Sequence, residues 1–114
     1  MKKIKLLTIF LLSFLILGCG ANSSEKDYKT LMQENDYVIV DVRTAEEYNE
    51  GHIKEAINIP YDKITTSNLD KNKLIFVYCK SGNRSKKAYN SLKSLGYTVY
   101  DLGAYNTIDL EKER

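Results

Sequence analysis

The amino-acid sequence predicts an α/β domain with a largely parallel sheet and helices on both of its faces. Two short apolar runs without polar alternation, at 37–40 and 74–78, are typical of parallel strands that are covered on both sides. Segments with helical spacing of apolar residues alternate along the chain with these and two further strand-like runs. Alternation of this kind favours a parallel sheet, because parallel neighbours need a crossover connection.

The first 18 residues precede this domain and have the pattern of an export signal. A basic stretch at 1–5 is followed by an apolar run at 6–17, which is too short to span a bilayer comfortably but fits a secretory signal. The run ends in an aliphatic residue, a small residue and Cys19, and this ending resembles the bacterial lipoprotein signal. The alternative for Cys19 is an ordinary secreted thiol or half of a disulfide.

The lipoprotein resemblance implies cleavage before Cys19 and attachment of lipid to its thiol and amine. We therefore expect a signal peptide at 1–18, a polar tether at 19–26 and a folded domain at 27–114. The protein would be exported and anchored to the bacterial cell envelope, on its periplasmic or extracellular face, through the lipid on Cys19. With Cys19 modified, Cys79 has no disulfide partner in the chain.

Charge argues against a nucleic-acid partner. The full chain has 17 Lys and Arg against 15 Asp and Glu, a formal net charge of +2. Cleavage after residue 18 removes three lysines and leaves 14 basic residues against the 15 acidic ones, so the mature charge is −1. The positive balance that nucleic-acid binding requires therefore belongs to the signal segment.

Local signals define the elements of the first half of the domain. A short amphipathic helix is predicted within 24–34, and a strand over 37–40 follows it. Thr44 and Glu47 have the spacing of a capping box, which predicts a helix that starts after Thr44. The residues at 51–53 break this helix.

The next elements lead to Cys79. Residues 56–60 are predicted as a short strand that ends at a proline, and 61–69 is weakly helical. A polar turn at 70–73 precedes the second fully apolar strand, 74–78. Cys79 directly follows this strand.

Three elements are predicted after the glycine-containing loop that follows Cys79. A helix over 85–95 has Ala88, Leu92 and Leu95 on one face, and the glycine at 96 suits its end. A strand over 97–100 follows, and a last short helix is predicted over 104–110 after a turn.

The position of Cys79 favours a reactive thiolate. A thiol at the tip of a strand and facing a helix N-terminus meets converging backbone N–H groups and the positive end of the helix dipole. Such surroundings lower a cysteine pKa from ~8.5 toward ~3.5–7.5. The loop contains no proline that would remove an N–H donor, and Gly82 permits a positive φ. The alternative is that Cys79 is a small buried apolar residue.

Four landmarks in this order resemble the rhodanese family of sulfurtransferases, over about residues 24–110. They are Val40-Asp41-Val42-Arg43, then Glu47 with Gly51-His52-Ile53 and 56–60, then the stretch 77–85, then Leu95-Gly96-Tyr97 with Leu102-Gly103. The resemblance implies a single three-layer α/β/α domain with a central, mostly parallel five-stranded sheet. The chain departs from the family in having Gly103-Ala104 and no Trp where two glycines and a downstream Trp are frequent.

The resemblance also implies a sulfurtransferase reaction. Cys79 would take a sulfane sulfur from thiosulfate or a persulfide donor, carry it as a persulfide and pass it to a thiol or another thiophilic acceptor such as cyanide. No metal or other cofactor is implied, and we expect a monomer. Lys80 and Arg84 would attract an anionic donor and stabilise departing sulfite.

Site roles follow from the same resemblance. Cys79 would be the catalytic residue, and the substrate would contact a loop made of Lys80, Ser81, Gly82, Asn83, Arg84 and Ser85. Asp41, Arg43 and His52 would support the site structurally. A Cys-His pair with His52 as general base is a weaker alternative.

Two other functions remain as alternatives. Tyrosine phosphatases of similar architecture need an arginine six positions after the cysteine, whereas Arg84 is five positions after Cys79. A non-catalytic module that binds a protein or senses persulfide is the alternative from a different class.

Overall fold

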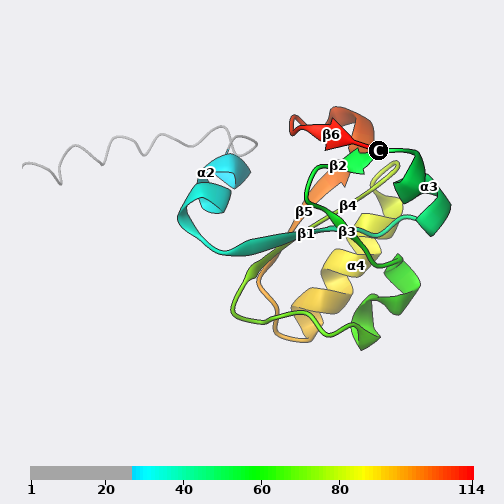
Figure 1. Ribbon diagram of the computed structural model, residues 1–114. Coiled ribbons are helices and arrows are strands. Elements are labelled where there is room, and N and C mark those ends of the chain that lie inside the picture. The colour runs from blue at the N-terminus through cyan, green and yellow to red at the C-terminus, as the bar shows by residue number, and fades with distance from the viewer. Residues whose placement is uncertain (1–26) are drawn as a thin grey trace, which may run out of the picture. The chain divides into compact units, whose positions relative to one another are not determined.

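The computed structural model describes residues 27–114, which fall into two units that are described separately (Figure 1). Helix α2 (Asp27–Glu34) belongs to the first unit and lies within the helix predicted at 24–34. The second unit is Asn35–Arg114. The predicted signal peptide, the tether and Cys19 lie outside the described residues. No helix within 27–114 combines the length and apolar character needed to cross a membrane.

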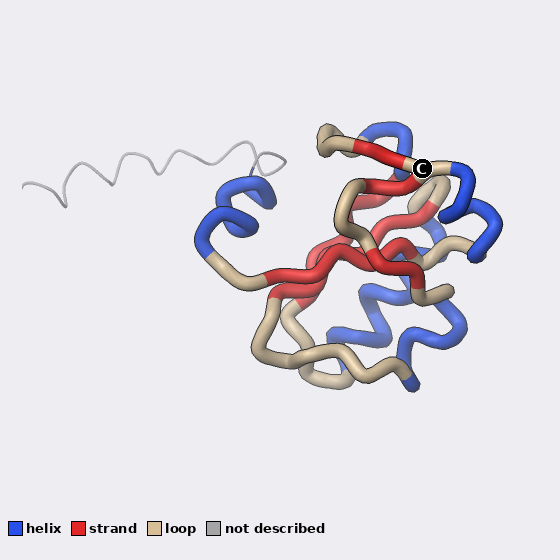
Figure 2. Tube along the Cα trace, in the orientation of Figure 1, coloured by secondary structure: helices blue, strands red, loops and turns tan. Residues whose placement is uncertain are grey.

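A parallel sheet forms the centre of the second unit (Figure 2). Its strands are β1 (Tyr37–Asp41), β3 (Ile57–Asn58), β4 (Leu74–Cys79) and β5 (Val99–Ala104), in the order β3-β1-β4-β5. All neighbouring strands are parallel, which confirms the predicted α/β class. The described residues contribute four strands to this sheet, and not the five that the family resemblance implied.

One face of the sheet packs against helix α4 (Asn83–Ser94) and the 3-10 helix η2 (Tyr61–Thr66) (Figure 1). The residues buried between these layers are apolar, and they include Val40, Val42, Ile64, Ile75, Val77, Ala88, Leu92 and Val99. Because β1 and β4 lie in the interior of the sheet, their side chains are enclosed, which explains the absence of polar alternation in both.

A two-stranded antiparallel sheet lies near the carboxyl end of β1. It pairs β2 (His52–Ile53) with β6 (Lys112–Glu113), and neither strand was predicted from the sequence. The residues at 51–53 do end helix α3 (Ala45–Glu50), as expected, but they then continue as β2.

The prediction of a helix over 104–110 was wrong. Strand β5 continues to Ala104, and only a 3-10 turn, η3 (Tyr105–Thr107), follows it. The pairing of β5 with β4 shifts by one residue, so that Val77 faces Asp101 while Tyr78 faces Gly103. Gly103 has φ +86°, which a bulge of this kind accommodates, and the strand therefore runs through residues predicted as a turn.

Candidate active site

Cys79 is the last residue of β4, and its sulfur accepts hydrogen bonds from backbone N–H groups of the following loop and of the first turn of α4. The N–H of Gly82 lies 3.0 Å from Sγ, and the N–H of Ser85 lies 3.3 Å from it. Gly82 has φ +103° at the start of α4, a left-handed conformation that turns the loop back over the thiol. The Cys79 side chain is buried, but a Cβ added at Gly82 would meet no atom within 4 Å. There is therefore free space beside Gly82, while the sulfur itself is covered.

The hydrogen bonds to Cys79 favour the thiolate. Burial by itself raises the pKa of Cys79, but the Ser85 hydroxyl and the N–H groups of Ser85, Gly82 and Ser81 outweigh it and lower the pKa below its ordinary value. Sequence reasoning included Ser85 only as a loop residue and missed that its side chain helps to lower the pKa of Cys79. Ser85 is fully buried, and its hydroxyl also lies 3.2 Å from the Gly82 carbonyl. The arrangement can hold an anionic sulfur atom without a general base.

The loop cation Arg84 is paired with a carboxylate from α3. Its Nη1 lies 2.9 Å from Oε1 of Glu47, and its Nη2 lies 3.2 Å from Oε2. Glu47 also accepts hydrogen bonds from the N–H and the hydroxyl of Thr44, which confirms the predicted capping box. The hydrogen bond from Arg84 lowers the pKa of Glu47 to about 2. Sequence reasoning used Glu47 only as a cap and family landmark, and it missed the ion pair with Arg84.

The other predicted loop residues lie at the surface. Lys80, Ser81 and Asn83 are exposed, so their side chains are accessible to a substrate. Lys80 directly follows Cys79 and adds a second positive charge to the loop.

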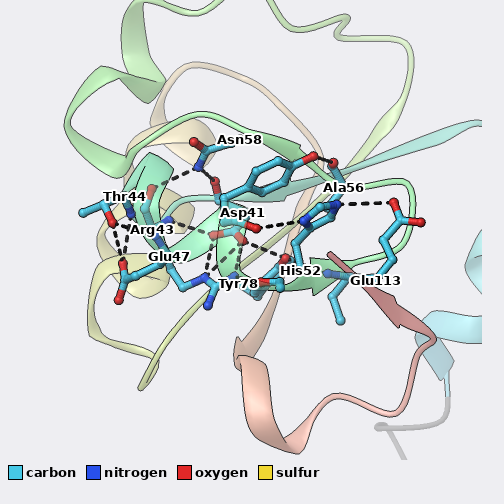
Figure 3. A network of polar contacts seen from close by, with 12 residues as sticks. Asp41, Arg43, Thr44, Glu47, His52, Ala56, Asn58, Tyr78 and Glu113 are labelled. Carbon is cyan, nitrogen blue, oxygen red and sulfur yellow. Dashed lines mark hydrogen bonds and ion pairs between the residues drawn. The ribbon is translucent and has the colours of Figure 1, made fainter.

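A buried polar cluster lies beside the carboxyl ends of β1 and β4 (Figure 3). The Asp41 carboxylate accepts hydrogen bonds from Arg43, including Nε to Oδ1 at 2.9 Å and Nη2 to Oδ2 at 2.6 Å. Tyr78 donates its hydroxyl to Asp41 Oδ2 at 2.8 Å and accepts the Ile53 N–H at 3.0 Å. Arg43 also donates to the Gly51 carbonyl at 2.7 Å. The cluster therefore joins β1, β2 and the residue that precedes Cys79.

His52 takes part in a separate set of contacts (Figure 3). Its ring stacks on Tyr48 at 3.8 Å between centroids, and Nδ1 lies 2.9 Å from the Tyr48 carbonyl. Because a carbonyl only accepts hydrogen bonds, Nδ1 carries a proton. Nε2 lies 3.3 Å from a Glu113 carboxylate oxygen. Both ring nitrogens thus face groups other than Cys79, so this geometry does not support the alternative of His52 as its general base.

The residues of 28–114 include no group of three or more His, Cys, Asp or Glu side chains that is arranged to hold a metal ion. The hydrogen bonds to the sulfur come from backbone N–H groups. Such donors suit an anion.

Comparison with known proteins gives consistent matches. A family described as Rhodanese-like domain matches residues 24–107. Thiosulfate sulfurtransferase PspE of Escherichia coli (strain K12) is 38% identical over 78 residues, which are 64% of this chain and 75% of that protein. Putative sulfur carrier protein YrkF of Bacillus subtilis (strain 168) is 36% identical over 61 residues, 52% of this chain but only 33% of that protein.

A solved structure agrees with the sequence matches. It is described as rhodanese with anions from E. coli, and it superimposes with a TM-score of 0.62 at 36% sequence identity. The match covers 68% of this chain and 98% of that structure.

Proposed function

The chain belongs to the family of Rhodanese-like domains, and we propose from this premise that it is a sulfurtransferase acting through a Cys79 persulfide. The donor is thiosulfate or a persulfide, and the acceptor is a thiol or another thiophilic nucleophile. The observation that carries the proposal is the position of the Cys79 sulfur, 3.0 Å from the Gly82 N–H and 3.3 Å from the Ser85 N–H.

In the first step, the Cys79 thiolate attacks the outer sulfur of thiosulfate. A new S–S bond forms at Cys79 while the S–S bond of thiosulfate breaks, and sulfite leaves with that electron pair. The persulfide formed at Cys79 is anionic, and the N–H groups of the loop are donors that stabilise an anion. Lys80 supplies positive charge near the departing sulfite, and the Arg84 guanidinium, paired with Glu47, lies in the same turn.

In the second step, a nucleophile attacks the terminal sulfur of the persulfide. With cyanide as acceptor, the product is thiocyanate; with a thiolate, it is a new persulfide on the acceptor. In both cases the electron pair of the broken S–S bond returns to Cys79 as thiolate. No proton donor or redox partner is required, because charge and electrons balance in each step.

Mass spectrometry of the full chain after incubation with thiosulfate tests the proposal. We expect the peptide that contains Cys79 to gain the mass of one sulfur atom, and subsequent cyanide to remove it with stoichiometric release of thiocyanate. Absence of the mass gain at Cys79 would contradict the sulfurtransferase assignment.

A persulfide-holding module is the second candidate, and the full burial of Cys79 is the observation that favours it. A sulfur stored under the loop would be protected from acceptors until a partner opened the loop. The match to a protein named as a putative sulfur carrier is compatible with such a role. A Cys79 persulfide that forms with thiosulfate but resists free cyanide would support the module over the enzyme.

We also propose that the protein is a lipoprotein anchored to the cell envelope through Cys19. The proposal rests on the basic stretch, the apolar run and the Gly18-Cys19 ending. In bacteria expressing the full chain, labelled palmitate should be incorporated into the protein, and the protein should sediment with membranes. Cys19→Ser should lose the palmitate label, and label retained in this variant would refute the proposal.

A further inference from the structure

We propose that Glu47 is a positioning residue that sets donor preference by holding and neutralising Arg84 beside Cys79. This inference rests on the proposed sulfurtransferase function and deepens it. A site with Arg84 neutralised favours donors of lower charge, such as persulfide monoanions, over the thiosulfate dianion.

The contact geometry shows that the Arg84 side chain is occupied. Both terminal guanidinium nitrogens face Glu47, one on each carboxylate oxygen, at 2.9 and 3.2 Å. The carboxylate is itself held by the Thr44 N–H at 2.9 Å and by the Thr44 hydroxyl at 3.2 Å. Glu47 therefore fixes the direction of Arg84 from the start of α3, and a donor anion must compete with a bidentate partner.

The ion pair between Glu47 and Arg84 reduces the positive charge that a donor anion meets near Cys79. The first turn of α4 contains no acidic residue, so its positive end and its cations would attract a dianion strongly. Glu47 supplies the opposing charge from another element. Because the pKa of Glu47 is about 2, chiefly through the hydrogen bond from Arg84, the carboxylate stays ionised at any ordinary working pH. Arg84 and Glu47 together then contribute no net charge, and Lys80 remains as the loop's exposed cation.

The negative charge of Glu47 can be removed by a substitution that keeps the capping box with Thr44. Glutamine serves at the same capping-box position as glutamate. Glu47→Gln thus retains an acceptor for Thr44 and Arg84 while it releases a full positive charge beside Cys79. Glu46→Gln is the matched control, because Glu46 is an exposed neighbour that undergoes the same charge change.

Steady-state kinetics with two donors provides the first test. In Glu47→Gln, the KM for thiosulfate should fall about 5-fold, the size expected for one partly exposed charge pair, with a smaller change in kcat. The KM for a singly charged alkyl persulfide should fall by about 2-fold, because half the charge gives half the free-energy change. Glu46→Gln should leave both KM values unchanged. An unchanged or raised KM for thiosulfate in folded Glu47→Gln would overturn the proposal.

Alkylation of Cys79 provides a second test that needs no turnover. The Cys79 thiolate displaces iodide from iodoacetate, an anion, or from iodoacetamide, which is neutral, and peptide mapping follows Cys79 alone. The ratio of the iodoacetate rate to the iodoacetamide rate should rise about 2-fold in Glu47→Gln, as for the singly charged persulfide. The midpoint of the iodoacetamide pH profile should move to lower pH, because removal of a nearby negative charge favours the thiolate.

The two tests separate this inference from the proposed function. A protein without any sulfur transfer would still show the change in alkylation ratio if Glu47 neutralises Arg84. An unchanged ratio in an active, folded Glu47→Gln would overturn the inference while leaving the sulfurtransferase assignment intact. In an Arg84→Gln background, Glu47→Gln should raise the ratio less than it does in the original chain; fully additive effects would refute the holding of Arg84.

Discussion

Thiocyanate formation from thiosulfate and cyanide is expected to fall by about 10³-fold or more in Cys79→Ser. The serine hydroxyl is a far weaker nucleophile toward sulfur, and its pKa is too high for the loop to hold it ionised. Serine is preferred to alanine because its oxygen still accepts hydrogen bonds from the Gly82 and Ser85 N–H groups, which contact Sγ at 3.0 and 3.3 Å. The loop should therefore keep its conformation.

Thermal unfolding of Cys79→Ser provides the control for this result. A midpoint within a few degrees of that of the original protein would show that the loss is chemical and not structural. Thiocyanate formation that persisted in folded Cys79→Ser would show that another group is the nucleophile and would contradict the proposed mechanism.

The sequence predicted the parts of the fold that depend on neighbouring residues. The capping box of Thr44 and Glu47 predicted helix α3, which the structure has at Ala45–Glu50. Two unbroken apolar runs predicted β1 and β4, because a strand enclosed on both faces has no polar alternation.

Contacts between distant residues left no comparable local signal. Glu47 and Arg84 are 37 residues apart. From the sequence, Glu47 is accounted for as part of a helix cap and Arg84 as a loop cation, so neither residue indicates the other as its partner. Strand β2 has two residues, too few to show an alternation of polar and apolar side chains. It forms by pairing with β6, which lies about 60 residues later in the sequence. The hydroxyl of Tyr78 reaches Ile53 across 25 residues in the same way. These features depend on tertiary structure, so a single sequence could not predict them.

Arg43→Met is expected to lower the free energy of unfolding by about 3–5 kcal/mol, because it leaves a buried carboxylate without its cation. Asp41 is fully buried, and Arg43 is only 5% exposed. Methionine keeps an apolar stem next to Tyr105, whose ring centroid lies 4.4 Å from the Arg43 guanidinium carbon. The main loss is therefore of charge and hydrogen bonds. Urea unfolding of residues 19–114, followed by circular dichroism, measures the change.

Arg84→Met is the matched control for this prediction. This substitution also leaves a carboxylate, that of Glu47, without its arginine partner. The Arg84 and Glu47 side chains are 28% and 26% exposed, however, so solvent can replace part of the lost interaction. We expect a loss of about 1 kcal/mol or less. If Arg43→Met does not fold, the double variant Asp41→Asn/Arg43→Met, which removes both charges, should be the more stable of the two. Equal losses in Arg43→Met and Arg84→Met, or a double variant less stable than Arg43→Met, would contradict the stabilising role of the buried Asp41–Arg43 pair.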